Sequence, residues 1–229
     1  MSTYLWLMLF SFAGPFVLSF DKKVAYYKKW KYLFPSILIV LTFFVVWDVA
    51  FTEHGIWSFN PSHVIGINLI NLPLEEWLFF IIVPFASVFI YECLNAYITK
   101  DILKIYSPFI TRAAIIILLW VAIFNLEKSY TSINFFTAAI LLSLHAFVWK
   151  SEYLSQFWLA YFVHLIPFFI INGILTAIPV VIYDNAENLG IRLYTIPIED
   201  TAYALTLLLG NITIMEFLQK RKKTIPSPK

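Results

Sequence analysis

Two short motifs place pairs of carboxyl groups directly before apolar stretches of the chain. They are Pro73-Leu74-Glu75-Glu76 and Pro197-Ile198-Glu199-Asp200. Acids inside a bilayer or at its edge are energetically unfavourable, so their presence there usually marks a functional site. When such groups are buried close together, one can hold a proton while a neighbour accepts one. The motifs therefore predict general acid–base chemistry by Glu75, Glu76, Glu199 and Asp200.

The simpler interpretation of each motif is an ordinary helix start. Pro73 and Pro197 suit a first helical turn, where the missing N–H breaks no hydrogen bond. Acids in that turn interact favourably with the positive end of the helix dipole. The duplication of the whole pattern argues for a shared site instead. Adjacent side chains on a helix point about 100° apart, so one acid of each pair is expected to face the bundle and the other a loop or a neighbouring helix.

Four further residues are candidate supporting groups. Asp48 ends an apolar stretch at the same expected depth as the first acid pair, and Asn172 lies at the equivalent depth beside the second. Trp77 and Phe79 adjoin the first pair, and aromatic faces stabilise cations. Acids framed by aromatic rings in an apolar cavity suit a carbocation reaction. For Asp48, a hydrated helix end is an equally good interpretation.

Other polar residues are expected to be structural. Glu92 and Glu216 follow the motifs by about 25 Å of helix, which places them at the opposite face of the membrane. His145 and His164 lack the spacing of partnered metal ligands. Cys93 is the only cysteine, so neither an intramolecular disulfide nor a cysteine-based metal site is expected. We predict no cofactor and no metal.

The composition identifies the elements that must position these groups. The chain has 229 residues, of which 61% are hydrophobic and 13% charged, with mean hydropathy +0.79. A soluble domain needs more polar surface than this. Apolar stretches near bilayer length predict an all-α integral membrane protein of about seven transmembrane helices. The stretches are Tyr4–Phe20, Leu33–Phe51, Trp77–Ile98, Ala113–Phe124, Ile133–Trp149, Phe157–Ile178 and Thr201–Leu218.

The basic residues predict the orientation. All of them except Lys128 and Arg192 fall in alternate connections or in the C-terminal tail. The positive-inside rule then puts the N-terminus outside and the C-terminus in the cytoplasm of a multi-pass cell-membrane protein. The first stretch lacks a preceding cation and a cleavage pattern, so we expect a retained helix and no signal peptide. Because the basic residues lie in short loops, nucleic acid is an unsuitable partner.

An internal repeat at an offset of 124 residues, from Pro73 to Pro197, relates the two motifs. Equivalent helices are four apart in sequence, so the halves share one orientation, as in parallel-repeat transporters. We expect a first repeat at 1–98, a linker with the fourth helix at 99–127 and a second repeat at 128–229. The same offset pairs Gly66 with Gly190, Asp48 with Asn172, Phe79 with Tyr203 and Glu92 with Glu216.

The duplicated segments Asn71-Leu72-Pro73-Leu74-Glu75-Glu76-Trp77 and Tyr194-Thr195-Ile196-Pro197-Ile198-Glu199-Asp200 resemble the paired motifs of the membrane-integral lycopene cyclases. Over nearly its whole length the chain is similar to the fused two-repeat form. The resemblance implies cyclisation of the linear ψ-ends of lycopene to β-rings without net redox change, in carotenoid biosynthesis. It carries over Pro73, Glu75, Glu76, Pro197, Glu199 and Asp200. Asp200 shortens the second motif's last side chain by one methylene, so the halves are not expected to be equivalent.

Other functions remain open from the sequence. A proton-coupled small-molecule transporter would also use symmetric membrane acids. A carotenoid hydratase, or a cyclase that makes another ring type, would begin with the same protonated alkene. The expected partners are lycopene and the lipid bilayer, and a homo-oligomer is compatible with the sequence.

Overall fold

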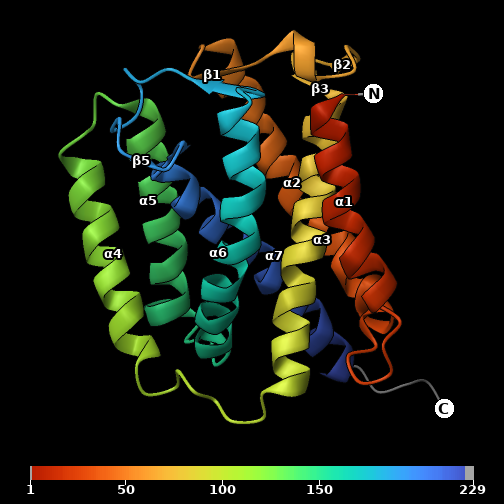
Figure 1. Cartoon of the computed structure of the whole chain (residues 1–229). Coiled ribbons are helices and arrows are strands. Elements are labelled where there is room, and N and C mark those ends of the chain that lie inside the picture. Colours follow the sequence, from red (N-terminus) through yellow and green to blue (C-terminus); the bar gives the residue numbers. More distant parts are fainter. Residues whose placement is uncertain (1, 225–229) are drawn as a thin grey trace.

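The computed structural model describes the backbone of residues 2–224 and the side chains as far as Arg221, and it is an all-α bundle (Figure 1). Each of the seven predicted apolar stretches forms a helix. The helices are α1 (Thr3–Leu18), α2 (Trp30–Glu53), α3 (Leu74–Tyr97), α4 (Ser107–Ile123), α5 (Ser129–Ser143), α6 (Leu154–Ala177) and α7 (Glu199–Thr224).

Five of these helical segments are long and apolar enough to cross a membrane, which makes the chain a multi-pass membrane protein. They contain α2, α3, α5, α6 and α7. The helices α1 and α4 are equally apolar but have 16 and 17 residues. Large apolar side chains such as Phe10, Val46 and Ile116 are more than half exposed on the bundle surface, as expected where lipid replaces water.

The fourth helix begins earlier than its apolar stretch indicates. The sequence predicts a start at Ala113, whereas α4 begins at Ser107. Arg112 interrupts the apolar run and hides the first turns from a hydropathy analysis, while Pro108 is well suited to the first turn.

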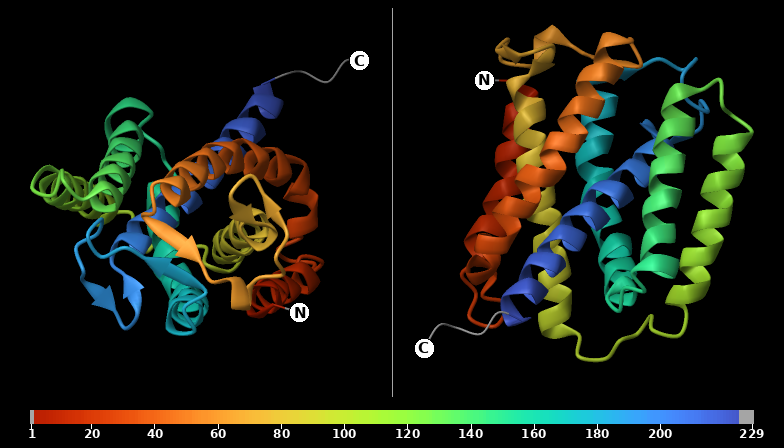
Figure 2. Two further views of the ribbon diagram at one scale, coloured as in Figure 1. Left: turned by 90° about the horizontal axis from the view of Figure 1, so that it is seen from above. Right: turned by 180° about the vertical axis from the view of Figure 1, so that it is seen from behind.

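The helices of the N-terminal part pack against those of the C-terminal part. The helix α2 contacts α7, and α3 contacts α6. In the right-hand view of Figure 2, α7 runs obliquely across the bundle in front of α6. At the α2–α7 contact, Ser36 Oγ donates a hydrogen bond of 2.7 Å to the Asn211 carbonyl. A Cβ built on Gly210 would lie 3.7 Å from the Val40 side chain, so the two helices approach closely.

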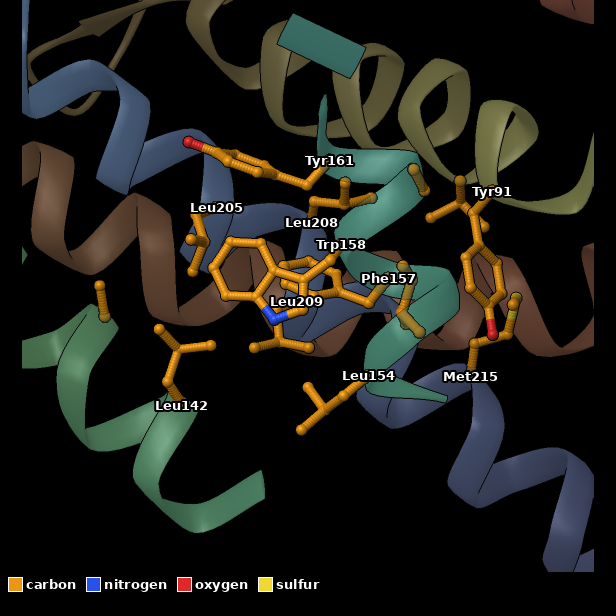
Figure 3. Close-up of a cluster of buried hydrophobic side chains, with 14 of the residues drawn as sticks. Tyr91, Leu142, Leu154, Phe157, Trp158, Tyr161, Leu205, Leu208, Leu209 and Met215 are labelled. Carbon is orange, nitrogen blue, oxygen red and sulfur yellow. The ribbon is translucent and has the colours of Figure 1, made fainter. Parts of the chain in front are cut away.

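The largest apolar core extends from α2 to α7, and Figure 3 shows part of it around α5, α6 and α7. Phe157 and Trp158 of α6 insert between Leu142 of α5 and Leu209 of α7, and all four side chains are buried. Trp158 Nε1 also donates a hydrogen bond of 2.8 Å to Thr111 of α4. This core fixes the positions of the three C-terminal helices and of α4.

Short strands cover the end of the bundle at which α1, α3 and α7 begin, which we call the acid end. Strand β1 pairs with β4, and Trp57 lies opposite Tyr183. Two hairpins, β2–β3 and β5–β6, lead directly into α3 and α7. The hydropathy pattern did not predict these strands, which have two or three residues. Their bounds are Trp57–Phe59, Asn68–Leu69, Leu72–Pro73, Val181–Tyr183, Arg192–Leu193 and Ile196–Pro197 for β1 to β6.

The other end of the bundle, called the opposite end, carries a separate set of polar contacts. Lys29 forms an ion pair of 2.6 Å with Glu92. Tyr91 donates a hydrogen bond to Glu216. A π-helical turn, η3 (Leu144–Val148), follows α5, and the ring nitrogens of His145 are hydrogen-bonded to Ser151 and Thr213.

Candidate active site

A cavity of about 440 Å³ extends from the acid end between α1, α3, α6 and α7. Its lining follows α1 from Tyr4 to Leu18, which corresponds to about 21 Å of helix. Most of the wall is apolar or aromatic. The carboxyl groups that line it are Asp48, Glu76 and Asp200.

The second acid of each motif thus faces one shared cavity. Glu76 is 7% exposed and Asp200 is 3% exposed. They belong to helices that start at the same end of the bundle, and their charges lie close enough to interact. The structure brings these two predicted site residues together across the cavity.

Tyrosine hydroxyls hold both carboxylates. The Tyr4 hydroxyl donates to Glu76 Oε2 at 2.6 Å. Tyr130 donates to Asp200 Oδ1 at 2.5 Å, and Tyr183 donates to Asp200 Oδ2 at 2.9 Å. Burial and the charge of Asp200 raise the pKa of Tyr183 in strand β4 well above its ordinary value, so this phenol remains a donor at neutral pH.

Asp48 and Asn172 join the same polar end of the cavity, as the sequence predicts. Asn172 Nδ2 lies 3.4 Å from Asp200 Oδ2. Asp48 is 2% exposed and lies near Glu76 and Trp57. Its Oδ2 has no hydrogen-bond partner within the described residues.

The first acid of each motif occupies a different environment. Glu75 and Glu199 are fully buried but do not line the cavity. Glu75 Oε1 accepts hydrogen bonds from Ser2 Oγ at 2.5 Å and from the Ile65 amide at 2.7 Å. Glu199 Oε1 is held in the same way.

The donors to Glu199 are Thr131 Oγ1 at 2.6 Å and the Leu189 amide at 2.8 Å. Each first acid therefore anchors the segment that leads into its own helix. The geometry supports direct chemistry at the cavity for Glu76 and Asp200 and an anchoring role for Glu75 and Glu199.

Aromatic rings form the wall beside the acids. The Tyr203 ring lines the cavity, with centroids of Phe44, Trp47 and Trp57 between 5.0 and 6.4 Å away. Trp57 lines the cavity with Tyr203, and Phe44 and Trp47 pack against Tyr203. Aromatic rings beside a cationic group stabilise it. Phe79, a predicted supporting residue, also lines the cavity.

The remaining predicted supporting residues lie beside the cavity. Trp77 Nε1 donates to the Leu69 carbonyl at 3.3 Å, so this ring packs on the β2–β3 hairpin. Pro73 precedes α3 in an extended conformation with φ −64°, and Pro197 ends β6. The prolines act by fixing the directions in which α3 and α7 begin.

Sequence reasoning missed Tyr4, Tyr130 and Tyr183 as site residues. Tyrosine is common in membrane proteins at the interface, so nothing in its spacing distinguished these three from the other ten. His164 of α6 also lines the cavity. Among the tyrosines of the cavity, Tyr203 is the one that the offset of 124 residues pairs with a predicted site residue, Phe79.

The polar residues at the opposite end are away from the cavity. Glu92 binds Lys29, and Glu216 and His145 bind hydroxyl groups of the bundle. Within residues 2–224 no three His, Cys, Asp or Glu side chains gather in a way that could hold a metal ion.

Comparisons with known proteins identify one family. The family model described as lycopene cyclase matches residues 1–94 and 127–218. A bifunctional lycopene cyclase/phytoene synthase of Neurospora crassa is 29% identical over 59 residues, which are 26% of this chain and 10% of that protein. A protein with the same description from Aspergillus oryzae is 30% identical over 83 residues, covering 36% of this chain and 14% of the relative. The chain thus matches a small part of these longer relatives, and no solved structure matches it.

Proposed function

Because the chain belongs to the lycopene cyclase family, we propose that it converts the linear ψ-ends of lycopene to β-rings at the acid-lined cavity. The observation that carries this proposal is the placement of Glu76 and Asp200, one from each motif, on a single apolar and aromatic cavity. A hydrocarbon substrate requires apolar walls, and a cationic intermediate requires aromatic faces and nearby carboxylates.

The proposed reaction is an isomerisation. A carboxylic acid adds its proton to the terminal carbon–carbon double bond, which leaves a cation on the adjacent carbon. A second double bond attacks that cation and closes the ring, and a carboxylate then removes a ring proton to leave a new double bond. One proton enters and one leaves, so the reaction needs no oxidant, reductant or cofactor.

The cavity offers a route for the rest of the polyene. Its apolar part continues along α1 past Phe10 and Gly14 to Leu18, away from the acids. Phe10 is 70% exposed and Leu18 is 55% exposed on the bundle surface, so this wall borders the lipid. We propose that the end group reaches the acids while the remaining chain extends along this wall into the bilayer.

We further propose that the chain contains two parallel repeats. The bounds of β1, β2, β3 and α2 coincide with those of β4, β5, β6 and α6 after the offset of 124 residues. Gly66 and Gly190, which the offset pairs, both have positive φ, and so do Ile70 and Tyr194. The family model skips 95–126, which contains α4, in agreement with a linker between repeats 1–98 and 128–229. The predicted orientation, with the acid end outside, is part of this proposal.

Expression of the chain in cells that accumulate lycopene tests the proposed function. Pigment analysis should show β-ring products, and Glu76→Gln should reduce them by about 10² to 10⁴-fold, the usual contribution of a general acid or base. Glu216→Gln at the opposite end is the matched control and should convert lycopene normally at equal membrane abundance. Unchanged lycopene in cells that express the wild-type chain would contradict the proposal and favour a transporter. Hydroxylated end groups would indicate a hydratase, and differently unsaturated end groups would indicate another ring type.

A further inference from the structure

The acids that the two motifs place on the cavity, Glu76 and Asp200, have different surroundings, and from these we infer that Glu76 donates the proton that starts cyclisation and Asp200 is the base that ends it. This inference rests on the proposed function, because it divides the two proton transfers between the acids of that site. The division follows from hydrogen-bond donors, neighbouring charges and the differences between the halves.

Asp200 is surrounded by hydrogen-bond donors. The hydroxyls of Tyr130 and Tyr183 bind its two oxygens separately, at 2.5 and 2.9 Å. The amide of Asn172 lies 3.4 Å from the second oxygen. Donors directed at both oxygens stabilise the ionised form of a carboxyl group. Asp200 is thus arranged to be a carboxylate when the substrate arrives.

A cation supports this arrangement from outside the cavity. Arg192 lies in strand β5, and its guanidinium carbon is 5.8 Å from the centre of the Tyr183 ring. Its hydrogen bonds to the Thr195 carbonyl at 2.9 Å and to Asn185 at 2.7 Å fix the group in place. The positive charge acts on Asp200 and favours its ionised form.

Glu76 has the opposite surroundings. Tyr4 is the single donor that the described part of the chain directs at it, at 2.6 Å. The carboxyl groups of Asp48, Glu75 and Asp200 all lie close enough to interact with its charge, whereas Asp200 interacts with the acids Glu199 and Glu76 and also with the positive charge of Arg192. Nearby like charges and few donors both favour the protonated form of a buried acid. Glu76 is therefore the group that holds a transferable proton.

The proposed repeat shows that this asymmetry is systematic. At the offset of 124 residues, the first half has Asp48 where the second has Asn172, and Phe59 where the second has Tyr183. Asn68 stands at the place of Arg192. On the side of Glu76, Asp48 adds an acid, Phe59 lacks the hydroxyl donor of Tyr183, and Asn68 lacks the positive charge of Arg192. Two equivalent positions have thus become suited to opposite proton transfers.

The roles predict different products from two isosteric substitutions. Glu76→Gln lacks the starting proton, so lycopene should remain unconverted. Asp200→Asn still allows protonation and ring closure but lacks the base that removes the ring proton. The cation should then lose a proton from another carbon to the Glu76 carboxylate, which displaces the double bond, or add water, which becomes a hydroxyl group after it gives a proton to the same carboxylate.

The decisive measurement is the pigment profile of both variants at equal membrane abundance. We expect Asp200→Asn to consume lycopene at least about ten-fold faster than Glu76→Gln and to yield altered end groups. Equal loss in both variants, or altered end groups from Glu76→Gln with none from Asp200→Asn, would overturn the assignment. Tyr183→Phe should shift the products in the direction of Asp200→Asn, and Phe59→Tyr is its counterpart in the other half.

Infrared spectra of the wild-type protein and of each variant, compared without substrate, distinguish a failure of this inference from a failure of the proposed function. The carbonyl band of a protonated carboxylic acid should disappear in Glu76→Gln and persist in Asp200→Asn. The reverse pattern would refute the assignment even if the protein cyclises lycopene. If wild-type protein leaves lycopene unchanged, the proposed function fails, and the spectra still decide which acid holds the proton.

Discussion

The carboxyl groups of Glu75 and Glu199 are buried but do not face the cavity. The backbone amides that they bind best explain their role. Ile65 and Leu189 lie 124 residues apart, which is the offset of the proposed repeat, and each donates its N–H to the acid ten residues later. A buried amide without a partner is unfavourable by about 1–3 kcal/mol. Each acid thus holds the chain in place where it approaches the cavity.

At the residue scale, we predict that Glu75 affects stability more than chemistry. Glu75→Leu removes the acceptor for Ser2 and Ile65 and should lower the free energy of unfolding by about 1–3 kcal/mol. Glu75→Gln keeps an acceptor oxygen and should be less destabilising. Thermal unfolding in detergent measures the difference, and lycopene conversion measures the chemistry. A Glu75→Gln protein that is folded but as inactive as Glu76→Gln would show that Glu75 transfers a proton.

The sequence predicted that one acid of each pair would face the bundle but not which one. Adjacent residues point about 100° apart, and the rotation of a helix about its axis is fixed by packing against distant elements. The apolar surface of α3 offers no clear polar face to reveal that rotation, because both lipid and protein surround it. Tyr183 was equally hidden, since its hydroxyl reaches Asp200 only after β4 pairs with β1.

At the element scale, the two hairpins determine where α3 and α7 begin. The Leu74 amide donates to the Ile67 carbonyl at 2.8 Å, and the Ile198 amide, 124 residues later, donates to the Ile191 carbonyl at 3.0 Å. Gly66 and Gly190 precede these contacts with φ of 83° and 72°. Such values are favourable for glycine and unfavourable for a residue with a Cβ.

Substitution of these glycines should therefore destabilise the acid end. Gly66→Ala and Gly190→Ala are each expected to lower the free energy of unfolding by about 1–2 kcal/mol, because alanine is strained at positive φ even though a Cβ would meet no atom within 4 Å. Gly210→Ala in α7 is the matched control, since its Cβ would make an ordinary contact of 3.7 Å with Val40. Equal unfolding temperatures for all three variants would contradict a structural role for the hairpin conformation.

The helices could be predicted and the strands could not, for a physical reason. A membrane helix must satisfy its own backbone over many residues, so a long apolar stretch is a strong signal. The strands β2 and β3 have two residues each, and their pairing depends on the turn between them. In the sequence, these hairpins were indicated only by Gly66 and Gly190, which are 124 residues apart.

At the scale of the whole molecule, the site lies between the two halves of the chain. Glu76 belongs to the first half and Asp200 to the second, while Tyr4 and Tyr130 come from α1 and α5. The contacts of α2 with α7 and of α3 with α6 join the halves around the cavity. The sequence indicated a shared cavity through the duplicated acids, but the pairing of helices across the halves required the structure.

This arrangement predicts that neither half alone can cyclise lycopene. A cut between Lys100 and Asp101 falls in the connection between α3 and α4, outside every helix, and leaves Glu76 in one fragment and Asp200 in the other. Co-expression of 1–100 and 101–229 should restore ring formation, because buried surfaces such as the Ser36–Asn211 contact bring the fragments together. Pigment analysis of each fragment alone and of the pair provides the measurement. Activity from a single fragment would show that one motif suffices.

Co-expression of full-length Glu76→Gln with full-length Asp200→Asn tests whether the site lies within one chain. Each variant lacks one cavity acid, and in this structure both acids line a cavity formed by a single chain. The mixture should therefore give no more β-ring product than the two variants expressed separately. Restored ring formation would mean that helices are exchanged between copies in a homo-oligomer, with the acid of one chain completing the cavity of another.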